Sequence, residues 1–384
     1  MRVFMATDFR IVIKNNKYYA KEKFSTNLMR YYESFGKIDL FCREDNVSNE
    51  MELVDITKYI NSVFIADSLL KVMLGKYNKE INNKVEKSDF IILRCFSFIC
   101  VKVFKYMKKY EKTYLAEVMN CAWDSLWNHS LKGKIVAPYI FFKTKEMILD
   151  ANYVTYVTEK FLQNRYPCKC KYASISDVDI LKINEEDILK SRNNKIKEFS
   201  NKKEIKIMTI GATNVKFKAQ KYVIKAIKKL KKDNIKIKYY LAGGGDTTRL
   251  RRIAKRCKVL ENILFLGELN RIELFSYLDN IDIYVHPSLQ EGLPRSVVEA
   301  MSRACPVIGA TTGGIPELIS KKFLVKRKSS KDIYNKIKYY CNLNEEQRKK
   351  VSLYNLEKTK KFNDLLLHRE RKKYYKYIKK QLIN

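Results

Sequence analysis

Residues 286–317, HPSLQEGLPRSVVEAMSRACPVIGATTGGIPE, constrain the fold more than any other stretch of this chain. An apolar, strand-like run at 281–285 precedes them, and a second apolar run at 305–309 lies within them. The helical spacing of apolar residues between the two runs gives the order strand, loop, helix, strand. This order predicts one unit of a parallel α/β sheet.

The loop of this stretch has the chemistry of a site for a sugar diphosphate. Pro294 suits the first helical position, where its missing N–H has no intrahelical partner. The free N–H groups around Gly292 and Leu293, together with the helix dipole, favour a phosphate. Glu291 on the loop and Glu299, about a turn and a half along the helix, would repel a phosphate. We therefore expect the two carboxylates to bind the hydroxyls of a sugar.

Seven residues separate Glu291 from Glu299 in the segment EGLPRSVVEAMSRACPVIGATTGGIPELI. This segment resembles the C-terminal half of retaining, nucleotide-sugar-dependent glycosyltransferases of family 4, the glycosyl transferases group 1. It is similar to members that build capsular or extracellular polysaccharide or lipopolysaccharide. The resemblance implies an α/β fold of the GT-B class, in which two Rossmann-like domains with parallel sheets face each other across a cleft. The alternative, a βαβ unit whose glutamates are merely exposed, stays open here.

The composition is that of a globular but very basic protein. A chain of 384 residues, of which 46% are hydrophobic, is long enough for about two domains. The net charge of +35 suits nucleic acid, an anionic membrane surface or a phosphorylated substrate. The abundance of Lys, Asn, Ile and Tyr is also typical of an AT-rich coding bias, which accounts for part of that charge.

Cysteine spacing and hydropathy indicate a cytoplasmic protein. The nine cysteines form no CxxC pair or other metal-binding spacing, so we interpret them as buried thiols in a reducing compartment. Without 18 consecutive apolar residues, a membrane-spanning helix is not expected. Any contact with the cell membrane would then be peripheral and on its inner face.

Both halves of the chain alternate between strand and helix patterns, which predicts two domains. We assign 1–185 to an acceptor-side domain, the charged run 186–203 to a linker and 204–365 to a nucleotide-sugar-binding domain. The resemblance implies that a C-terminal helix at about 366–384 packs back on the first domain.

The start of the second domain supplies further donor-site candidates. A strand at 205–210 enters a turn at Gly211, where family members carry an Arg and a Lys-Gly pair that hold the diphosphate. Lys218 and Ala219 fall on the Lys-Gly pair, and Lys216 stands where the Arg is usual. Both positions depart from the family pattern, and a lysine binds phosphate without the bidentate fork of arginine. The resemblance also implies backbone contact with the base near Gly267. The predicted donor-binding residues are Gly211, Lys216, Lys218, Gly267, Gly292, Leu293, Pro294 and Glu299.

The acceptor side has weaker signals. A short strand at 2–7 precedes what is predicted to be a long polar loop, with Asp8 lining the acceptor site. Arg94 interrupts an apolar strand, so it either reaches the ligand crevice or pairs with a nearby carboxylate. Asp124 and His129 follow another strand. Family members often place a histidine near the reacting carbon, which makes His129 a catalytic candidate, although a surface or core histidine is the commoner case.

The resemblance implies transfer of a sugar, with retention, from a nucleotide diphosphate sugar to a carbohydrate or lipid-linked acceptor. Glu291 would orient the donor sugar, while Lys216, Lys218 and the helix N-terminus would stabilise the leaving diphosphate. We therefore expect no metal or other cofactor and no nucleic-acid partner. Two alternatives remain, a nucleotide-sugar epimerase of the same fold and a basic nucleic-acid-binding protein. The sugar, the base, the acceptor and the oligomeric state are left open.

Overall fold

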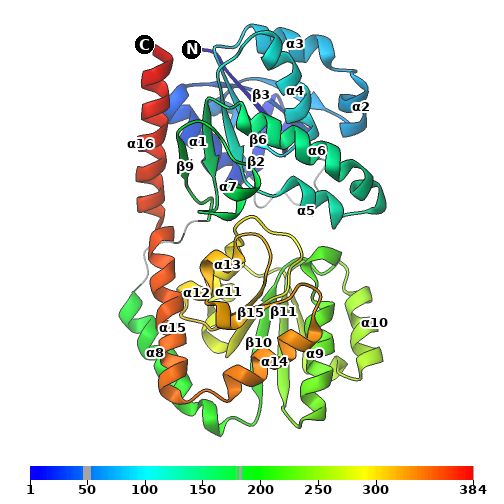
Figure 1. Ribbon diagram of the computed structural model, residues 1–384, viewed down its shortest axis with the longest axis vertical. Helices are drawn as coiled ribbons and strands as arrows, with labels where there is room; N and C mark the ends of the chain where they lie inside the picture. The colour runs from blue at the N-terminus through cyan, green and yellow to red at the C-terminus, as the bar shows by residue number, and fades with distance from the viewer. Residues whose placement is uncertain (46–52, 179, 181–183, 384) are drawn as a thin grey trace. The chain divides into compact units, whose positions relative to one another are not determined.

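The computed structural model describes residues 1–45, 53–178, 180 and 184–383. Its contacts divide the chain into two compact units, each with its own sheet (Figure 1). The first unit comprises Met1–Trp123, Ile135–Ile175 and His368–Asn384, and the second comprises Asp124–Lys134 and Ser176–Leu367.

The first unit is built on a mostly parallel sheet in the order β5-β3-β1-β6-β7-β8-β9. The first three strands lie to one side of the junction between β1 and β6, and the later strands lie to the other. Ligands bind at such a reversal of strand order, beyond the carboxyl ends of the strands. The parallel strands are β1 (Val3–Lys14), β3 (Ile38–Glu44), β5 (Ile60–Ala66), β6 (Phe90–Cys95), β7 (Tyr114–Val118), β8 (Tyr153–Tyr156) and β9 (Tyr172–Ser174).

The long polar loop predicted after residue 7 is wrong, because this part of the chain forms a β-hairpin. Strand β1 continues to Lys14 and pairs antiparallel with β2 (Lys17–Lys21), which in turn pairs with β4 (Leu53–Asp55). Asn15 and Asn16 have φ values of 48° and 57°, the left-handed values that a two-residue hairpin turn needs. Asparagine adopts this conformation more readily than most residues, and the pair thereby sets the turn.

Helices flank this sheet, and the C-terminal helix is one of them. The hydroxyl of Tyr374 accepts from the Val154 N–H at 3.2 Å and donates to the Lys171 carbonyl at 2.7 Å, which ties the helix to β8 and to the chain just before β9. The helices are α1 (Glu22–Phe35), α2 (Leu69–Leu74), α3 (Asn78–Glu86), α4 (Phe98–Lys109), α5 (Ala122–Trp127), α6 (Leu131–Leu149), α7 (Phe161–Arg165) and α16 (Asp364–Ile383), of which α5, α6 and α16 cross the boundary between the units.

The second unit has an all-parallel sheet in the order β12-β11-β10-β13-β14-β15. In chain order this is 3-2-1-4-5-6, so the order of the strands reverses between β10 and β13. Its strands are short and mostly buried, as expected for a sheet covered on both faces. They are β10 (Ile205–Ile210), β11 (Ile237–Ala242), β12 (Ile263–Gly267), β13 (Ile283–His286), β14 (Val307–Ala310) and β15 (Leu324–Val325).

Amphipathic helices complete the core of the second unit. Helix α9 shows the principle, because Val223, Ala226, Ile227 and Leu230 recur at helical spacing and are fully buried. The helices are α8 (Glu185–Lys197), α9 (Lys221–Lys232), α10 (Thr248–Cys257), α11 (Arg271–Asn280), α12 (Arg295–Ser302), α13 (Ile315–Leu318), α14 (Ser330–Cys341) and α15 (Glu345–Thr359).

The run 186–203, predicted as a linker, is mostly helix α8 and groups with the second unit. The Asn184 side chain caps its first turn, and acidic residues there complement the helix dipole. Arg192 is buried and donates to the carbonyls of Ile281 and Leu278 at 2.7 and 2.8 Å. These hydrogen bonds fix α8 on the second unit. The charge-rich, Gly-free sequence of this run does not reveal such contacts. In the described residues, no helix is long and apolar enough to cross a membrane.

Candidate active site

The candidate site lies where the strand order of the second unit reverses. Lys218 ends the short helical turn η4 (Lys216–Lys218) after β10, and Glu291 lies in the loop after β13. Their side chains meet there, with Lys218 Nζ 2.7 Å from Glu291 Oε1. Because β10 and β13 are neighbours whose connections leave in opposite directions, their carboxyl ends form the crevice in which sheets of this type bind ligands.

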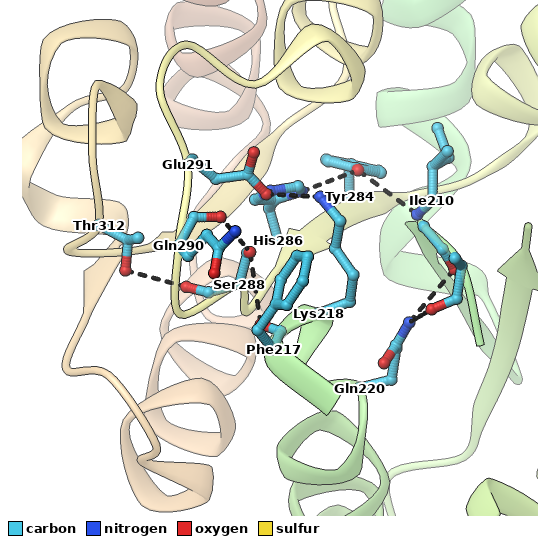
Figure 2. A network of polar contacts seen from close by, with 12 residues as sticks. Ile210, Phe217, Lys218, Gln220, Tyr284, His286, Ser288, Gln290, Glu291 and Thr312 are labelled. Atoms are coloured by element: carbon cyan, nitrogen blue, oxygen red, sulfur yellow. Dashed lines mark hydrogen bonds and ion pairs between the residues drawn. The ribbon is translucent and has the colours of Figure 1, made fainter. Parts of the chain in front are cut away.

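A chain of hydrogen bonds runs from β10 to the carboxylate of Glu291 (Figure 2). The Ile210 N–H donates to the Tyr284 hydroxyl at 3.4 Å, and that hydroxyl lies 3.1 Å from Nδ1 of His286. His286 Nε2 lies 3.0 Å from Glu291 Oε1. Nε2 of the ring faces the carboxylate, and a ring proton on this nitrogen donates to Glu291.

These contacts decide the charge of Glu291. Burial raises the pKa of its carboxyl, but the hydrogen bond from His286 and the positive charge of Lys218 outweigh burial and lower the pKa to about 2. Glu291 is therefore a carboxylate at neutral pH, held by a cation and a ring N–H. An ionised carboxylate accepts hydrogen bonds, which suits it to bind hydroxyl groups.

Hydrogen bonds to backbone carbonyls hold the loops after β10, β13 and β14 in place. The Leu289 N–H donates to the Phe217 carbonyl at 2.8 Å, and the Thr312 hydroxyl donates to the Ser288 carbonyl at 2.9 Å. The Gln220 amide donates to the carbonyl of Gly211 at 3.2 Å. The positions of Lys218 and Glu291 are thus set by the backbone as well as by their own ion pair.

Two glycines allow this close packing. A Cβ on Gly211 would lie 3.2 Å from Cδ of Lys218, whose side chain passes over it. Gly313 has φ of +55°, and a Cβ there would lie 2.2 Å from the carbonyl oxygen of Glu291. Glycine is required at 313 because both the conformation and the space exclude a side chain.

Helix α12 starts one residue later than predicted. Pro294 is its N-cap residue, with ψ of 116°, so the first helical N–H belongs to Arg295. Gly292 lies two residues before Pro294, and the Gly292 carbonyl accepts a hydrogen bond from the Gly314 N–H at 2.7 Å. Leu293, between Gly292 and Pro294, is half-buried. The loop that carries Glu291 leads directly into the N-terminus of the helix, and the phosphate site there stays a prediction.

Glu299 shares the surroundings of Glu291. It lies on α12 and is half-buried. Burial raises the pKa of the Tyr284 hydroxyl, and the charges of Glu299 and Glu291 raise it further, so both carboxylates lie near this tyrosine. The two glutamates are therefore brought to the same part of the unit.

The remaining predicted donor residues lie at strand ends of the same sheet. Lys216 is exposed, beside the half-buried Lys218. Ala219, where the family has glycine, adopts the left-handed conformation with φ of 59°. Gly267 ends β12 with φ of +73°, and its carbonyl accepts from the Gly243 N–H at 2.6 Å. No contact in the described residues links Lys216 or Gly267 to Glu291 directly.

Asp124 and His129 group with the second unit, not with the first, where they were predicted. Asp124 is buried, and its carboxylate lies 3.3 and 3.4 Å from two guanidinium nitrogens of Arg327. His129 is exposed and follows α5, and its backbone N–H donates to Leu126. Within the part of the chain that the structure describes, no contact joins the side chain of either residue to the Glu291 cluster, so the catalytic role of His129 stays a prediction.

Arg94 pairs with a nearby carboxylate, which is one of the two alternatives that the sequence leaves open. It is 4% exposed and lies 3.4 Å from the carboxylate of Glu117 on β7. Glu117 also accepts hydrogen bonds from the hydroxyls of Tyr31 and Tyr375. Arg94 is thus part of a buried polar cluster that links α1, β6, β7 and α16, and not an acceptor-site side chain pointing outward.

Asp8 lies at the strand-order reversal of the first unit. The register of β1 against β3 shifts between Ala6 and Arg10, and the pairing of β1 with β6 ends at Ala6, so Asp8 lies at an irregularity of β1 beside this reversal. Burial raises the pKa of its carboxyl, against a hydrogen bond from Ser97, which follows β6, and the charge of Arg43. Asp8 therefore occupies the position in its unit that Lys218 and Glu291 occupy in theirs.

The sequence analysis did not single out His286, which contacts the Glu291 carboxylate, or Tyr284, whose hydroxyl contacts the His286 ring. The signal was present, because residues two apart in a strand point to the same face and His286 is the last residue of β13. A histidine at the carboxyl end of a strand beside the strand-order reversal is in reach of the site. What the sequence does not contain is the contact between this ring and Glu291 in the following loop.

Comparison with known proteins identifies the family to which this chain belongs. Residues 190–357 match the family described as glycosyl transferases group 1. Protein CapJ of Staphylococcus aureus is 30% identical over 374 residues, which cover 93% of this chain and 92% of that protein. The O-antigen biosynthesis glycosyltransferase WbnH of Escherichia coli is 36% identical over 98 residues, 26% of this chain and 28% of that protein.

A solved structure shares the fold. HepE of Anabaena, in a crystal structure with UDP-glucose, has a TM-score of 0.64 and 15% sequence identity, covering 97% of this chain and 99% of that chain. At this identity the likeness concerns the fold, which is α/β with parallel sheets and of the GT-B class. The chain belongs to the glycosyl transferases group 1 family and is a glycosyltransferase.

Proposed function

We propose that this glycosyltransferase moves a sugar, with retention, from a nucleotide diphosphate sugar to a carbohydrate or lipid-linked acceptor during assembly of a bacterial surface polysaccharide. The observation that carries the proposal is the Lys218–Glu291 pair at the strand-order reversal of the second unit. The similarity to CapJ along nearly the whole chain supports it, as does the role of WbnH in O-antigen biosynthesis.

When the donor binds, its diphosphate would replace the carboxylate of Glu291 as the ion-pair partner of Lys218. Both phosphate and carboxylate are partners for an ammonium group, and a diphosphate carries more charge. Lys216 and the N-terminus of α12 would add positive potential on the leaving group, as expected for electrostatic stabilisation of a transition state. These groups supply the charge that a metal ion would otherwise supply, so we propose a metal-independent reaction.

Glu291, released from Lys218 and still bonded to His286, would accept hydrogen bonds from hydroxyls of the donor sugar. This would orient the anomeric carbon toward the acceptor. Glu299 would accept from the ribose hydroxyls. In the reaction, the acceptor oxygen forms a bond to the anomeric carbon, the bond from that carbon to the diphosphate breaks, and the acceptor proton passes to the departing phosphate oxygen. Attack and departure on the same face retain the configuration.

On the acceptor side, we propose that Asp8 binds an acceptor hydroxyl. Burial raises the pKa of its carboxyl, so this group takes up a proton at a higher pH than an ordinary aspartate does, and the protonated form can donate a hydrogen bond as well as accept one. Its position at the reversal of strand order in the first unit supports this role. A lipid-linked acceptor would bring the basic surface of this chain to an anionic membrane.

The test is a screen of nucleotide sugars for ligands that raise the melting temperature, followed by turnover with lipid-linked acceptors. We expect one donor to be consumed only when acceptor is present, with the product retaining the anomeric configuration by NMR and with full activity in excess EDTA. Loss of activity that a divalent ion restores would contradict metal independence. Formation of a new sugar nucleotide from donor alone would indicate an epimerase instead.

A further inference from the structure

The first unit contains a cavity of about 410 Å³ between α1 and the C-terminal helix α16. The two helices lie side by side (Figure 1), and the rings of Tyr31 and Tyr375 stack at 5.8 Å between them. The side chains around the cavity include five lysines and arginines but one carboxylate, that of Glu33. The lining residues are Arg30, Glu33, Ser34, His368, Arg371, Lys372, Tyr375, Lys376 and Lys379.

Helix α16 presents these cations on one face. Lys372 and Lys376 are four residues apart, and Arg371 and Lys379 lie on the same side of the helix. Like charges at this spacing repel one another in the free protein, so an anion that binds among them relieves the repulsion. Arg30 and Ser34 on α1 face them across the cavity.

The inner wall of the cavity is fixed by the protein core. Tyr375 is 2% exposed, and its hydroxyl donates to Glu117 Oε1 at 2.9 Å. Arg371 is 6% exposed, so its guanidinium group is held at the wall and does not extend into solvent. Lys372, Lys376 and Lys379 are exposed at the rim. The cavity therefore combines a buried arginine with exposed lysines.

This cavity is distinct from the candidate active site. All of its lining residues lie on α1 and α16, whereas Asp8 lies in β1 and, in the other unit, Lys218 and Glu291 follow the carboxyl ends of β10 and β13. Binding of the donor or the acceptor at the strand ends therefore does not explain the positive charge of this cavity.

We propose that the α1–α16 cavity binds a phosphate-bearing anion, either the headgroup of an anionic phospholipid or a soluble phosphate. Arginine binds phosphate through a planar pair of N–H groups, and lysines add point charges around it. The volume falls in the range of small-molecule sites, at roughly 300–1,000 Å³. This inference does not depend on the proposed transfer reaction.

The test compares two double variants of the full chain. Lys372→Gln/Lys376→Gln removes two rim charges, and Lys105→Gln/Lys380→Gln removes two exposed charges of the same unit that do not line the cavity. One arm measures co-flotation with phosphatidylglycerol and with phosphatidylcholine vesicles. The other measures the rise in melting temperature with inorganic pyrophosphate, with Lys216→Ala/Lys218→Ala added to all proteins to weaken the proposed donor site.

A headgroup site predicts that the affinity for phosphatidylglycerol vesicles falls roughly 30-fold in the cavity variant, because each of the two lysines contributes about 1 kcal/mol. The control variant should lose clearly less affinity. A site for soluble phosphate predicts that the cavity variant alone loses the pyrophosphate-dependent rise in melting temperature. Either selective loss supports the proposal and identifies the source. If the cavity variant and the control behave alike in both arms, the proposal is wrong.

Discussion

Lys218 and Glu291 are 73 positions apart in the chain, yet their charged groups lie 2.7 Å from each other. The contact exists because their loops leave the two adjacent strands at which the sheet reverses its order. It places a phosphate-binding cation and a hydroxyl-binding carboxylate at one point. A donor that carries both a diphosphate and a sugar would engage both groups, which is the central claim of the proposed function.

Replacing Lys218 with Ala should weaken binding of the nucleotide diphosphate. Loss of one charge-assisted hydrogen bond, at about 1.5–3 kcal/mol, corresponds to roughly a tenfold to hundredfold rise in Kd. Calorimetric titration measures it, with Lys225→Ala, an exposed lysine of α9, as the control. An unchanged Kd in Lys218→Ala would contradict the assignment of this lysine to the diphosphate.

The stability of the protein should depend on Glu291 in the acid range. Its pKa falls from an ordinary 4.5 to about 2. A lowered pKa gives stability that is complete above pH 4.5 and is lost as the pH falls through 2, worth about 3 kcal/mol. The difference in unfolding free energy between wild type and Glu291→Gln should therefore shrink between pH 5 and pH 2 in urea titrations. A difference that stays constant would mean that Glu291 has an ordinary pKa.

Two glycines with positive φ should respond differently to alanine. Gly313→Ala forces a Cβ against the Glu291 carbonyl, so it should lower stability by about 2 kcal/mol or more and also lower turnover. Gly267→Ala meets open space and should cost only the conformational term, about 1 kcal/mol. Thermal or urea unfolding of both variants checks this. Equal losses would show that loop packing at Gly313 is not what holds Glu291.

Breaking the buried pair in the first unit should destabilise it strongly. Glu117→Gln leaves the Arg94 guanidinium without its carboxylate in an interior site, at a cost of about 3–5 kcal/mol. The exposed pair of Glu346 and Lys350 offers a control, since Glu346→Gln should cost less than about 1 kcal/mol. Similar unfolding free energies for both variants would contradict a structural role for the pair.

The sequence predicts the donor half of the fold well because its pattern is local and strong. The strand before His286, the Gly-Leu-Pro loop and the helix with Val297, Val298 and Met301 buried all occur as expected. Buried parallel strands and amphipathic helices leave this pattern in any chain that folds this way. Ala219 shows the limit, since only the structure reveals that this residue adopts the left-handed conformation.

Other elements leave no such pattern. Helix α6 contains Pro138, and its exposed face carries Leu131 and Ile135, at 79% and 80% exposed, so neither helix propensity nor periodicity marks it. The hairpin turn of Asn15 and Asn16 lacks the glycine that usually signals it. The pairing of Arg94 with Glu117 depends on the neighbouring positions of β6 and β7, which is a property of the sheet and not of either segment.

The most direct test of the central claim is the turnover of Glu291→Gln with its donor and acceptor. The amide keeps the size of the side chain but removes the charge that binds Lys218 and the sugar hydroxyls. We predict a fall in kcat of about a hundredfold or more, with Kd for the nucleotide diphosphate nearly unchanged and the protein still folded. Near-normal turnover in this variant would contradict the role of Glu291 and with it the proposed active site.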